Sequence, residues 1–561
     1  MLRFEKRPAP EGAESRPGED WLDELLAIRG IDTPEKAEAF LHPRLENLYD
    51  PFLMQDMDRI VSLIREAVAN GTRIMVFGDY DADGICAAAI LTETLQEEGA
   101  DVTWRLPSRH AEGYGLNEAA VREAAQDGGM LITVDCGIAS VEEIALANSL
   151  GLTVIVTDHH TLPETLPQAD AVTNPLLGGY PCPNLCGAGV ALKICQALQG
   201  MRGVEKRLDL AAVATVADVV PLLDENRIIV AEGLKRIENS ARPGLRALLR
   251  VSATNPPLRA DHLAFRIGPR LNAAGRLESA DIAEQLLLTR EAEEAEVLAR
   301  HLEDLNGRRQ QMERATTAEA DRQANTRADF NTSRVLVVSG EGWNPGLIGL
   351  TAGRLCEKYH RPVVALSISG DTATGSCRSV PGVNIYDMLK ACGDLLERYG
   401  GHAQAAGLTV RTEKIEAFRE KLERVIRESC DPACFDPVKE YDLALPFRTW
   451  TPTVDVAKDA DGKALKIYDR KVNDSSRGGK REATETIVSW NGKEWDFSTW
   501  LTECTELIGK EFTMDEDYYF VMGDHRNNSN DSRAVGAIER SMIIGHVRRV
   551  LYPFSSWRGV E

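Results

Sequence analysis

The feature that most constrains the fold is an apolar run followed at once by three aspartates at alternate positions. The run is Ile74–Phe77, the aspartates are Asp79, Asp81 and Asp83, and an apolar helix-like segment follows at Ile85–Leu95. If the run is a buried strand, the aspartates lie at or just past its carboxyl end, where open α/β sheets bind ligands. Three unpaired carboxylates repel one another and are costly to bury. The stretch is therefore either an acidic surface turn or a site for a divalent cation.

Strands and helices alternate from about residue 71 to residue 175. We predict strands at Arg73–Phe77, Asp101–Leu106, Met130–Val134, Leu152–Val156 and Ala171–Asn174. Helices are predicted between most of them, at Gly84–Glu98, Asn117–Gln126 and Val141–Leu150. This alternation predicts an α/β fold with a mostly parallel sheet covered by helices.

Acidic or imidazole side chains follow three further apolar segments. Asp135 and the run Asp158-His159-His160 each follow one, and Asp218 follows the apolar run Leu210–Ala217. In a parallel sheet such points can converge on one edge. Helix capping explains one such aspartate, but it does not explain six or more groups from four segments. We therefore predict a metal site, and carboxylate oxygens suit Mg²⁺ or Mn²⁺.

These groups resemble motifs one to four of the DHH phosphoesterase superfamily. Three longer segments are more specific and resemble the RecJ family of single-stranded-DNA-specific exonucleases, namely Arg109–Asn117, Asn184–Lys193 and Arg266–Leu277. The segments Phe40–Pro43 and Asp50–Leu53 are similar to that family too. The resemblance covers roughly residues 1 to 430.

The resemblance implies a metal-dependent 5′-to-3′ exonuclease that hydrolyses single-stranded DNA to mononucleotides in DNA repair and recombination. It implies two ions, Mn²⁺ or Mg²⁺, held by Asp79, Asp81, Asp83, Asp135, His159 and Asp218. We expect Asp135 to bridge the ions and His160 to contact the phosphate, so that the catalytic residues are Asp135, His159 and His160. Single-stranded DNA is the expected partner, and single-strand-binding protein is a candidate partner.

A second domain is predicted after a long helix. Residues 284–329 are rich in Glu, Ala, Arg and Leu and contain no proline, which predicts a linker helix. Beyond it we expect strands at Arg334–Val338, Pro362–Leu366 and Leu408–Arg411. The predicted divisions are an N-terminal region, a DHH catalytic domain, the linker helix, a DHH-associated domain and a tail, at residues 1–50, 51–283, 284–329, 330–435 and 436–561.

Three glycine-bearing segments stand out in the second domain: Gly342–Gly349, Gly375–Ser379 and Gly400–Gly407. Each alone could be a tight turn, but small residues also let a phosphate chain approach the backbone. Together they resemble the DHH-associated domain, whose GGHxxAAG element contacts substrate, although Asn344 stands where the family often has histidine. The predicted substrate-binding residues are Arg109, Arg276, Ser376, Arg378, Gly400, Gly401 and His402, and three of them (Arg276, Ser376 and Arg378) are expected to hold a 5′ phosphate.

The alternation of strand and helix patterns stops in the tail, and we expect the tail to be mostly β structure. The segment Tyr518–Arg533 resembles the C-terminal box of type I signal peptidases, and the features of the OB-fold usual in RecJ proteins are not recognisable. A Ser/Lys protease needs a nucleophilic serine beside a basic lysine. The nucleophile and lysine boxes of that family are not found upstream, so a protease function is rejected and a truncated signal-peptidase fragment is predicted.

Composition limits the remaining possibilities. The net charge of −22 excludes a protein that coats nucleic acid through bulk positive charge. Eleven scattered cysteines, no run of about 18 apolar residues and no secretory signal predict a cytoplasmic protein without membrane association. We expect it to be a monomer. The alternatives are a DHH phosphodiesterase for short oligonucleotides or cyclic dinucleotides, a DHH pyrophosphatase, and a DNA-binding module without catalysis, which the full ligand set argues against.

Overall fold

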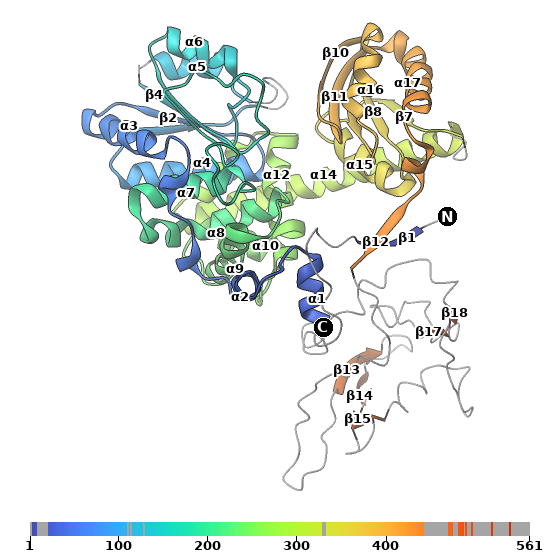
Figure 1. The fold of residues 1–561 in the computed structure, drawn as a ribbon, viewed down its shortest axis with the longest axis horizontal. Coiled ribbons are helices and arrows are strands. Elements are labelled where there is room, and N and C mark those ends of the chain that lie inside the picture. Colours follow the sequence, from blue (N-terminus) through green and yellow to red (C-terminus); the bar gives the residue numbers. More distant parts are fainter. Residues whose placement is uncertain are drawn as a thin grey trace. The chain divides into compact units, whose positions relative to one another are not determined.

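The computed structural model describes residues 3–7, 21–108, 112, 115–126, 129–327 and 332–442, and six short strands after residue 468. The chain divides into a larger unit, Arg7–Pro437, and a smaller one made of residues 2–6 and 438–561. The larger unit carries two five-stranded sheets (Figure 1). None of the helices in the described residues is both long and apolar enough to span a membrane.

The first sheet is parallel throughout and has the strand order β3-β2-β4-β5-β6. Its strands are β2 (Ile74–Phe77), β3 (Val102–Arg105), β4 (Met130–Val134), β5 (Thr153–Thr157) and β6 (Ala171–Thr173). The prediction of a parallel α/β sheet is therefore confirmed, with strand ends shifted by a residue or two. Because β2 lies between β3 and β4, the strand order reverses at β2 and β4, which is where sheets of this kind bind ligands.

Both faces of this sheet are buried because successive side chains of each strand point to opposite sides. Ile74 and Val76 pack in one core with α4, α7 and α8, whereas Met75 and Phe77 pack in another with α5 and α6. The bounds of the covering helices are α3 (Met57–Asn70), α4 (Ala82–Glu97), α5 (Glu118–Gln126), α6 (Val141–Ser149), α7 (Gly187–Gln199) and α8 (Met201–Ala217). The layered arrangement is visible in Figure 1.

One apolar segment has a different structure from the other three that precede acidic groups. Residues Leu210–Ala217 form the last two turns of α8, and Asp218 is the C-terminal cap of that helix. Asp218 therefore reaches the cluster from the end of a helix and not from a strand of the sheet. A short run that is apolar on every side is consistent with a buried helix or a buried strand, so its periodicity could not decide between them.

Smaller elements surround these layers. Thr33 caps α2, because its hydroxyl accepts a hydrogen bond of 3.2 Å from the backbone N–H of Lys36. The elements before β2 are α1 (Trp21–Ile28), α2 (Pro34–Leu41), η1 (Leu45–Asn47) and η2 (Pro51–Leu53). Those after α8 are α9 (Asp224–Glu238), α10 (Pro243–Val251), α11 (Ala260–His262), the π-helical turn η3 (Leu263–Ile267), α12 (Gly268–Leu277) and α13 (Asp281–Leu288).

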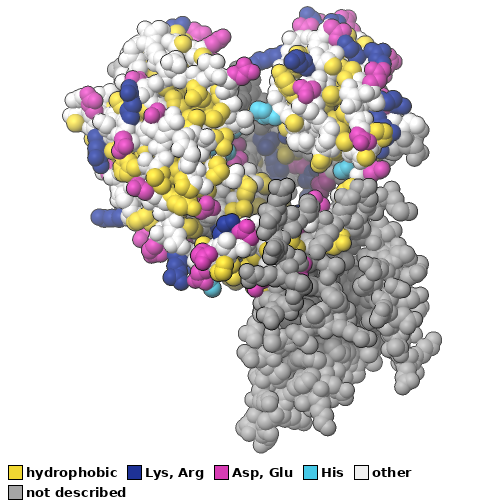
Figure 2. All heavy atoms as spheres, viewed as in Figure 1, with side chains coloured by type: hydrophobic (Ala, Val, Ile, Leu, Met, Phe, Trp, Pro, Cys, Tyr) yellow, Lys and Arg dark blue, Asp and Glu magenta, His cyan; other side chains and the backbone are white. Residues whose placement is uncertain are grey.

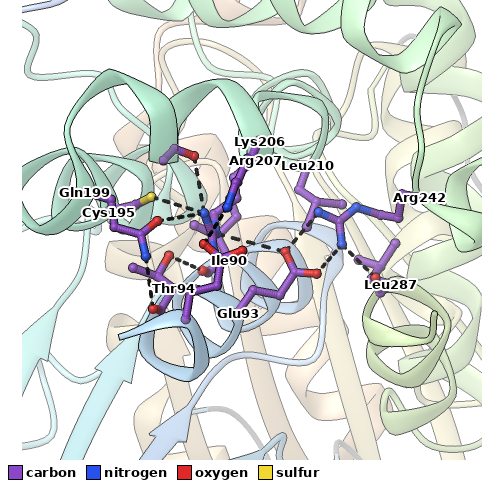
Figure 3. Close-up of polar contacts among 12 residues, drawn as sticks. Ile90, Glu93, Thr94, Cys195, Gln199, Lys206, Arg207, Leu210, Arg242 and Leu287 are labelled. Atoms are coloured by element: carbon purple, nitrogen blue, oxygen red, sulfur yellow. Dashed lines mark hydrogen bonds and ion pairs between the residues drawn. The ribbon is translucent and has the colours of Figure 1, made fainter. Parts of the chain in front are cut away.

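A buried ionic network ties α4 to α8 and to the segment before α10. Arg242 binds both carboxylate oxygens of Glu93 at 2.6 and 3.0 Å, and it lies 3.4 Å from Asp209. The fully buried Arg207 lies 3.2 Å from Glu97 and donates to Gln199 at 3.1 Å. Figure 3 shows the two guanidinium groups on either side of Glu93. The helices whose ends carry Asp83 and Asp218 are thus held together by charge as well as by packing.

The predicted long helix is present as α14 (Ala292–Arg327), which has 36 residues. It does not begin at residue 284 as expected, because α13 ends at Leu288 and Thr289 is extended. Two apolar residues of this helix, Leu302 and Leu305, are buried in the first core.

The second sheet has the order β10-β11-β9-β8-β7, and only β7 and β8 are parallel. Its strands are β7 (Leu336–Glu341), β8 (Val363–Ser369), β9 (Thr372–Arg378), β10 (Leu396–Gly401) and β11 (Ala405–Arg411). The helical elements with it are α15 (Ile348–Tyr359), α16 (Ile385–Ala391), η4 (Gly393–Leu395), η5 (Thr412–Lys414), α17 (Ile415–Ser429) and η6 (Pro432–Phe435). Strands β9 and β10 were not predicted, because their glycines and charged residues have low strand propensity.

In the smaller unit, β1 (Arg3–Lys6) pairs in parallel with β12 (Val438–Tyr441). The other described strands form three antiparallel pairs, β13 (Asp469–Asp474) with β14 (Arg481–Thr486), β15 (Ser489–Trp490) with β16 (Trp495–Asp496), and β17 (Tyr518–Tyr519) with β18 (Ile538–Glu539). Apart from its first two residues, the signal-peptidase-like segment Tyr518–Arg533 lies outside the described residues.

Candidate metal centre

The loop after β2 brings two aspartates to the start of α4. Asp79 is buried, and its Oδ1 accepts a hydrogen bond of 2.8 Å from the N–H of Tyr80. Asp81 is the N-terminal cap of α4, and its Oδ1 accepts from the N–H groups of Asp83 at 2.9 Å and Gly84 at 3.1 Å. Capping uses one oxygen of Asp81, so its other oxygen remains available to a ligand.

Asp83 lies in the first turn of α4 and is held by the start of another helix. Its two carboxylate oxygens accept hydrogen bonds from the N–H groups of Gly187 at 2.7 Å and Ala188 at 2.8 Å, the first two residues of α7. Helix N-termini favour negative charge because their N–H groups are unpaired and the helix dipole is positive there. The buried carboxylate of Asp83 is thereby fixed in position.

Asp135 follows β4 in a left-handed conformation, with φ of 59°, and is buried. Its Oδ1 lies 3.1 Å from Nε2 of His159, yet no donor in the described residues makes a hydrogen bond to it. A Cβ added to Gly187 would lie 2.4 Å from the Cβ of Asp135 and 2.6 Å from its Oδ1. Only glycine at position 187 therefore leaves room for Asp135.

The two histidines after β5 are positioned by Asp158. One oxygen of Asp158 accepts from the backbone N–H groups of His159 at 2.7 Å and His160 at 3.0 Å, and lies 2.7 Å from Nδ1 of His160. Its other oxygen accepts from the N–H of Ile138 at 2.9 Å. Burial lowers the pKa of His160, but the hydrogen bond to Asp158 and the charges of Asp158, Asp79 and Asp83 raise it to about 9. A cationic His160 is suited to a phosphate oxygen.

Asp218 joins the cluster from the end of α8. Its Oδ2 lies 3.9 Å from Nε2 of His159, which is also 3.7 Å from Oδ2 of Asp83. Three sets of side chains have candidate ligand atoms within 4.8 Å of one another: Asp79, Asp81 and Asp135; Asp83, His159 and Asp218; and Asp135, His159 and His160. The structure therefore brings all six predicted metal ligands together, with Asp135 reaching both the other aspartates and His159.

The carboxylates repel one another strongly in the absence of a cation. Burial, followed by the charges of Asp83, Asp81 and Asp79, raises the pKa of Asp135 well above its usual value. Burial and the charges of Asp83 and Asp81 likewise raise the pKa of Asp218 to about 8. A divalent cation would relieve this repulsion and give the Oδ1 of Asp135 a partner, so the residues fit the predicted ions.

The predicted substrate-binding residues lie on two other parts of the larger unit. Arg276, on α12, donates from Nη1 to the backbone oxygen of Gly346 at 2.9 Å. Arg378, on β9, donates from Nη1 to Oγ of Ser376 at 3.3 Å. A Cβ on Gly349, at the start of α15, would lie 3.0 Å from Oγ of Ser376, so the glycine keeps this serine accessible.

Two of the three glycine segments, Gly375–Ser379 and Gly400–Gly407, lie mainly in strands, whereas Gly342–Gly349 is a turn that leads into α15. Gly400 and Gly401 end β10 and are exposed, and His402 begins the turn to β11 with its N–H donating to the oxygen of Ala405 at 2.8 Å. Gly400 pairs with Gly407, which in turn pairs with Ser376 of β9. This arrangement places two exposed glycines in register with Ser376. The remaining predicted residue, Arg109, lies outside the described residues.

Two residues that support the cluster were not predicted. Gly187 is one, and Asn272 is the other, since its Oδ1 accepts from the N–H of Ala82, the first residue of α4, at 2.9 Å. Both lie inside segments that carried the family resemblance, at Asn184–Lys193 and Arg266–Leu277. Their roles depend on contacts over more than 50 residues of sequence, which no local pattern reveals.

Models of known families match three parts of the chain. The model of the DHH family, N-terminal domain, matches residues 73–217, and the DHHA1 domain matches residues 332–428. The first match contains every predicted metal ligand except Asp218, which directly follows it. The model of signal peptidase, peptidase S26, matches residues 456–552, in agreement with the resemblance predicted for the tail.

Proteins of known activity extend these matches. The chain is 38% identical over 440 residues to the single-stranded-DNA-specific exonuclease RecJ of Salmonella typhimurium, covering 73% of this chain and 75% of that protein. This chain belongs to the RecJ family. The RecJ of Bacillus subtilis is 40% identical over 75% of this chain, and the chain spans 54% of the length of that relative. RecJ enzymes are hydrolases of the DHH phosphoesterase superfamily, and so is this chain.

Solved RecJ structures share the fold of this chain. A RecJ exonuclease bound to manganese is 38% identical with a TM-score of 0.63, covering 70% of this chain and 98% of that one. RecJ from Thermus thermophilus in complex with Mn²⁺ is 35% identical with a TM-score of 0.64, covering 79% of this chain and 64% of that one. The RecJ assignment thus rests on sequence and on fold.

Proposed function

We propose that this RecJ-family chain is a metal-dependent exonuclease that degrades single-stranded DNA from the 5′ end to mononucleotides. The observation that carries the proposal is the cluster of five carboxylates and two imidazoles at the point where the strand order of the first sheet reverses. Support comes from the RecJ relatives, which are single-stranded-DNA-specific exonucleases. A role in DNA repair and recombination, in the cytoplasm, accords with that activity.

Six residues would hold two ions, Mn²⁺ or Mg²⁺, as the RecJ structures with either metal suggest: Asp79, Asp81, Asp83, Asp135, His159 and Asp218. Bound cations supply Lewis-acid stabilisation of the scissile phosphate and an activated water. Asp135 would be shared between the ions, because its Oδ1 is buried without a hydrogen-bond donor among the described residues and the residue belongs to two of the three sets. His160, held by Asp158 through Nδ1, would donate a hydrogen bond from its other ring nitrogen to a phosphate oxygen.

The 5′ phosphate would be held by Arg276, Ser376 and Arg378. The exposed Gly400 and Gly407 beside Ser376 support this role, because no neighbouring atom among the described residues requires glycine at either position. A Cβ at Gly400 would meet no atom within 4 Å, and one at Gly407 would meet only the oxygen of Gly375 at 3.8 Å. Glycine within a strand is unfavourable for stability. Close approach of a substrate backbone explains why glycine stands there.

Single strands would then be selected because they can reach the site, and not because the protein reads their base sequence. Contacts to phosphate position a strand without reading its bases. We expect a narrow groove between the catalytic and DHH-associated domains to admit one strand and exclude a duplex. Figure 2 shows Lys and Arg side chains interspersed with Asp and Glu over the face in view, so binding would depend on local contacts rather than overall charge. The chain would act as a monomer, with single-strand-binding protein as a candidate partner.

Product analysis on different substrates tests the proposal. The wild-type chain with Mn²⁺ is given a long single strand, a duplex, a dinucleotide and a cyclic dinucleotide, and products are followed over time. We expect mononucleotides to be released progressively from the 5′ end of the long single strand, and little product from the duplex. Preferred hydrolysis of the dinucleotide or the cyclic dinucleotide would instead support a DHH phosphodiesterase of small substrates and would contradict the exonuclease proposal.

A further inference from the structure

An exposed valine directly follows the metal ligand Asp218. Val219 adopts a left-handed conformation, with φ of 63°, and its residue is 84% exposed. It occupies the position just after the C-terminal cap of α8, where glycine usually provides the left-handed conformation. A β-branched residue with positive φ is an outlier. Neither backbone preference nor packing therefore explains a valine here.

An exposed phenylalanine lies close by on a different element. Phe265 is 79% exposed, whereas Leu263 and Ile267 at the two ends of the same π-helical turn, η3, are buried. Single π-helical turns occur frequently at functional sites. The turn is held by its buried leucine and isoleucine, and it presents the aromatic ring to the outside.

The two residues belong to one neighbourhood because η3 and the end of α8 are packed together. A Cβ added to Gly268, the residue after η3, would lie 3.1 Å from the Cβ of Ala217. Ala217 directly precedes Asp218 in the chain. Val219 and Phe265 each lie within three residues of this contact, so both flank the end of α8 that supplies Asp218 to the metal centre.

We propose that Val219 and Phe265 form an apolar platform for unpaired nucleobases next to the metal centre, with the ring of Phe265 stacking on a base. The inference rests on the proposed function, because it names a contact of the same substrate. Aromatic rings are the usual partners of bases in single strands, since every base has a π-face. Single exposed apolar side chains are common on proteins, but Val219 directly follows a predicted metal ligand and Phe265 lies on the turn that packs against the same end of α8.

The platform adds a second source of strand selection. In a duplex each base is stacked on its neighbours and paired with its complement, so its face is not available to a protein ring. In a single strand the base can leave its neighbours and stack on Phe265. Selection would then depend on bases as well as on the width of the access path, although not on base identity.

The platform is tested by combining a substitution of Phe265 with the removal of single bases from the substrate. The wild-type chain and Phe265→Ala are compared by kcat/KM on a 5′-phosphorylated single strand and on strands with one abasic nucleotide at each of the first positions. We expect Phe265→Ala to lower kcat/KM roughly 5- to 100-fold on the normal strand. At the contacted position, the abasic change should lower kcat/KM for the wild type and have no further effect on the variant. Phe265→Trp should restore the rate.

Two other variants complete the test. Val219→Gly removes the side chain and suits the left-handed backbone, so it should fold as stably as the wild type while kcat/KM falls. Leu150→Ala is the control, because Leu150 is also exposed and apolar but lies before β5, at the sheet edge opposite the metal ligands. Its kcat/KM should equal that of the wild type.

The outcomes separate the platform from the proposed function. If the wild type degrades single strands and Phe265→Ala and Val219→Gly match it, the platform is refuted and the exonuclease proposal stands. Equal loss by Phe265→Ala on normal and abasic strands at every position would also refute the platform, because the ring would not be contacting a base. A wild-type chain that does not degrade single strands overturns the proposed function and the platform with it.

Discussion

Replacing Gly187 with alanine should disable the metal centre while leaving the chain folded. A Cβ at this position would lie 2.4 Å from the Cβ of Asp135 and 2.7 Å from its Cγ. Because nonbonded carbon atoms approach to about 3.5 Å, Asp135 or the start of α7 has to move by roughly 1 Å. The start of α7 also holds Asp83 through two hydrogen bonds, so either movement displaces a predicted ligand.

The size of the effect follows from that displacement. A misplacement of about 1 Å at a reacting centre lowers the rate by about 10²-fold. The expected result is therefore a kcat/KM about 100-fold lower on a 5′-labelled single-stranded oligonucleotide with Mn²⁺. Weaker Mn²⁺ binding, measured by calorimetric titration, should accompany it. The thermal unfolding midpoint should change by only a few degrees, because alanine is favoured over glycine in a helix by up to about 1 kcal/mol.

Gly189→Ala is the matched control on the same helix. The three atoms nearest to a Cβ there would all belong to the side chain of Leu185, with its Cδ2 at 3.2 Å and its Cβ at 3.3 Å, and none of them belongs to a predicted ligand. This variant should keep wild-type kcat/KM and Mn²⁺ affinity. The reasoning is refuted if Gly187→Ala also keeps both, since Asp135 would then have no need of the space that glycine leaves.

Three further predictions concern stability and substrate binding. Glu93→Ala leaves the guanidinium of Arg242, whose side chain is only 10% exposed, without its bidentate partner and should destabilise the fold by about 3–5 kcal/mol in urea denaturation, whereas a change below 1 kcal/mol would contradict the network. Arg378→Ala should weaken the preference for a 5′-phosphorylated over a 5′-hydroxyl strand, and an unchanged ratio of kcat/KM would remove it from the phosphate site. Gly407→Ala should weaken single-strand binding in a fluorescence titration without lowering stability. Its control, Gly375→Ala, should have the lower free energy of unfolding of the two variants, because a Cβ there meets Leu366 and Leu408. If Gly407→Ala were instead the less stable variant, glycine at 407 would serve the fold, which would contradict a substrate role for Gly407.

Local patterns were sufficient for the first sheet and most of the metal centre. The apolar runs before Asp79, Asp135 and Asp158 are strands, and parallel strands place their carboxyl ends together, so the convergence could be inferred from the chain alone. The strand order was not predictable in the same way, yet it explains the site, since β2 and β4 carry Asp79 and Asp135 at the reversal.

Other features depend on contacts between distant segments. The run before Asp218 is a helix, and its apolar residues do not distinguish a buried helix from a buried strand. Gly187 is required by Asp135, and Asn272 completes the start of α4, but both relations join residues more than 50 positions apart. Strand β9 was missed because its inward residues include Gly375, whose small size reflects packing against Leu366 and Leu408.

The central claim is that the cluster around Asp135 is a metal centre that hydrolyses single-stranded DNA. The most direct measurement is the rate of nucleotide release from a 5′-labelled single strand with Mn²⁺, by the wild type and by Asp135→Ala. We predict that the wild-type rate depends on Mn²⁺ and that the variant falls to the rate measured without metal. A variant that keeps its Mn²⁺-dependent activity would contradict the assignment of the metal centre.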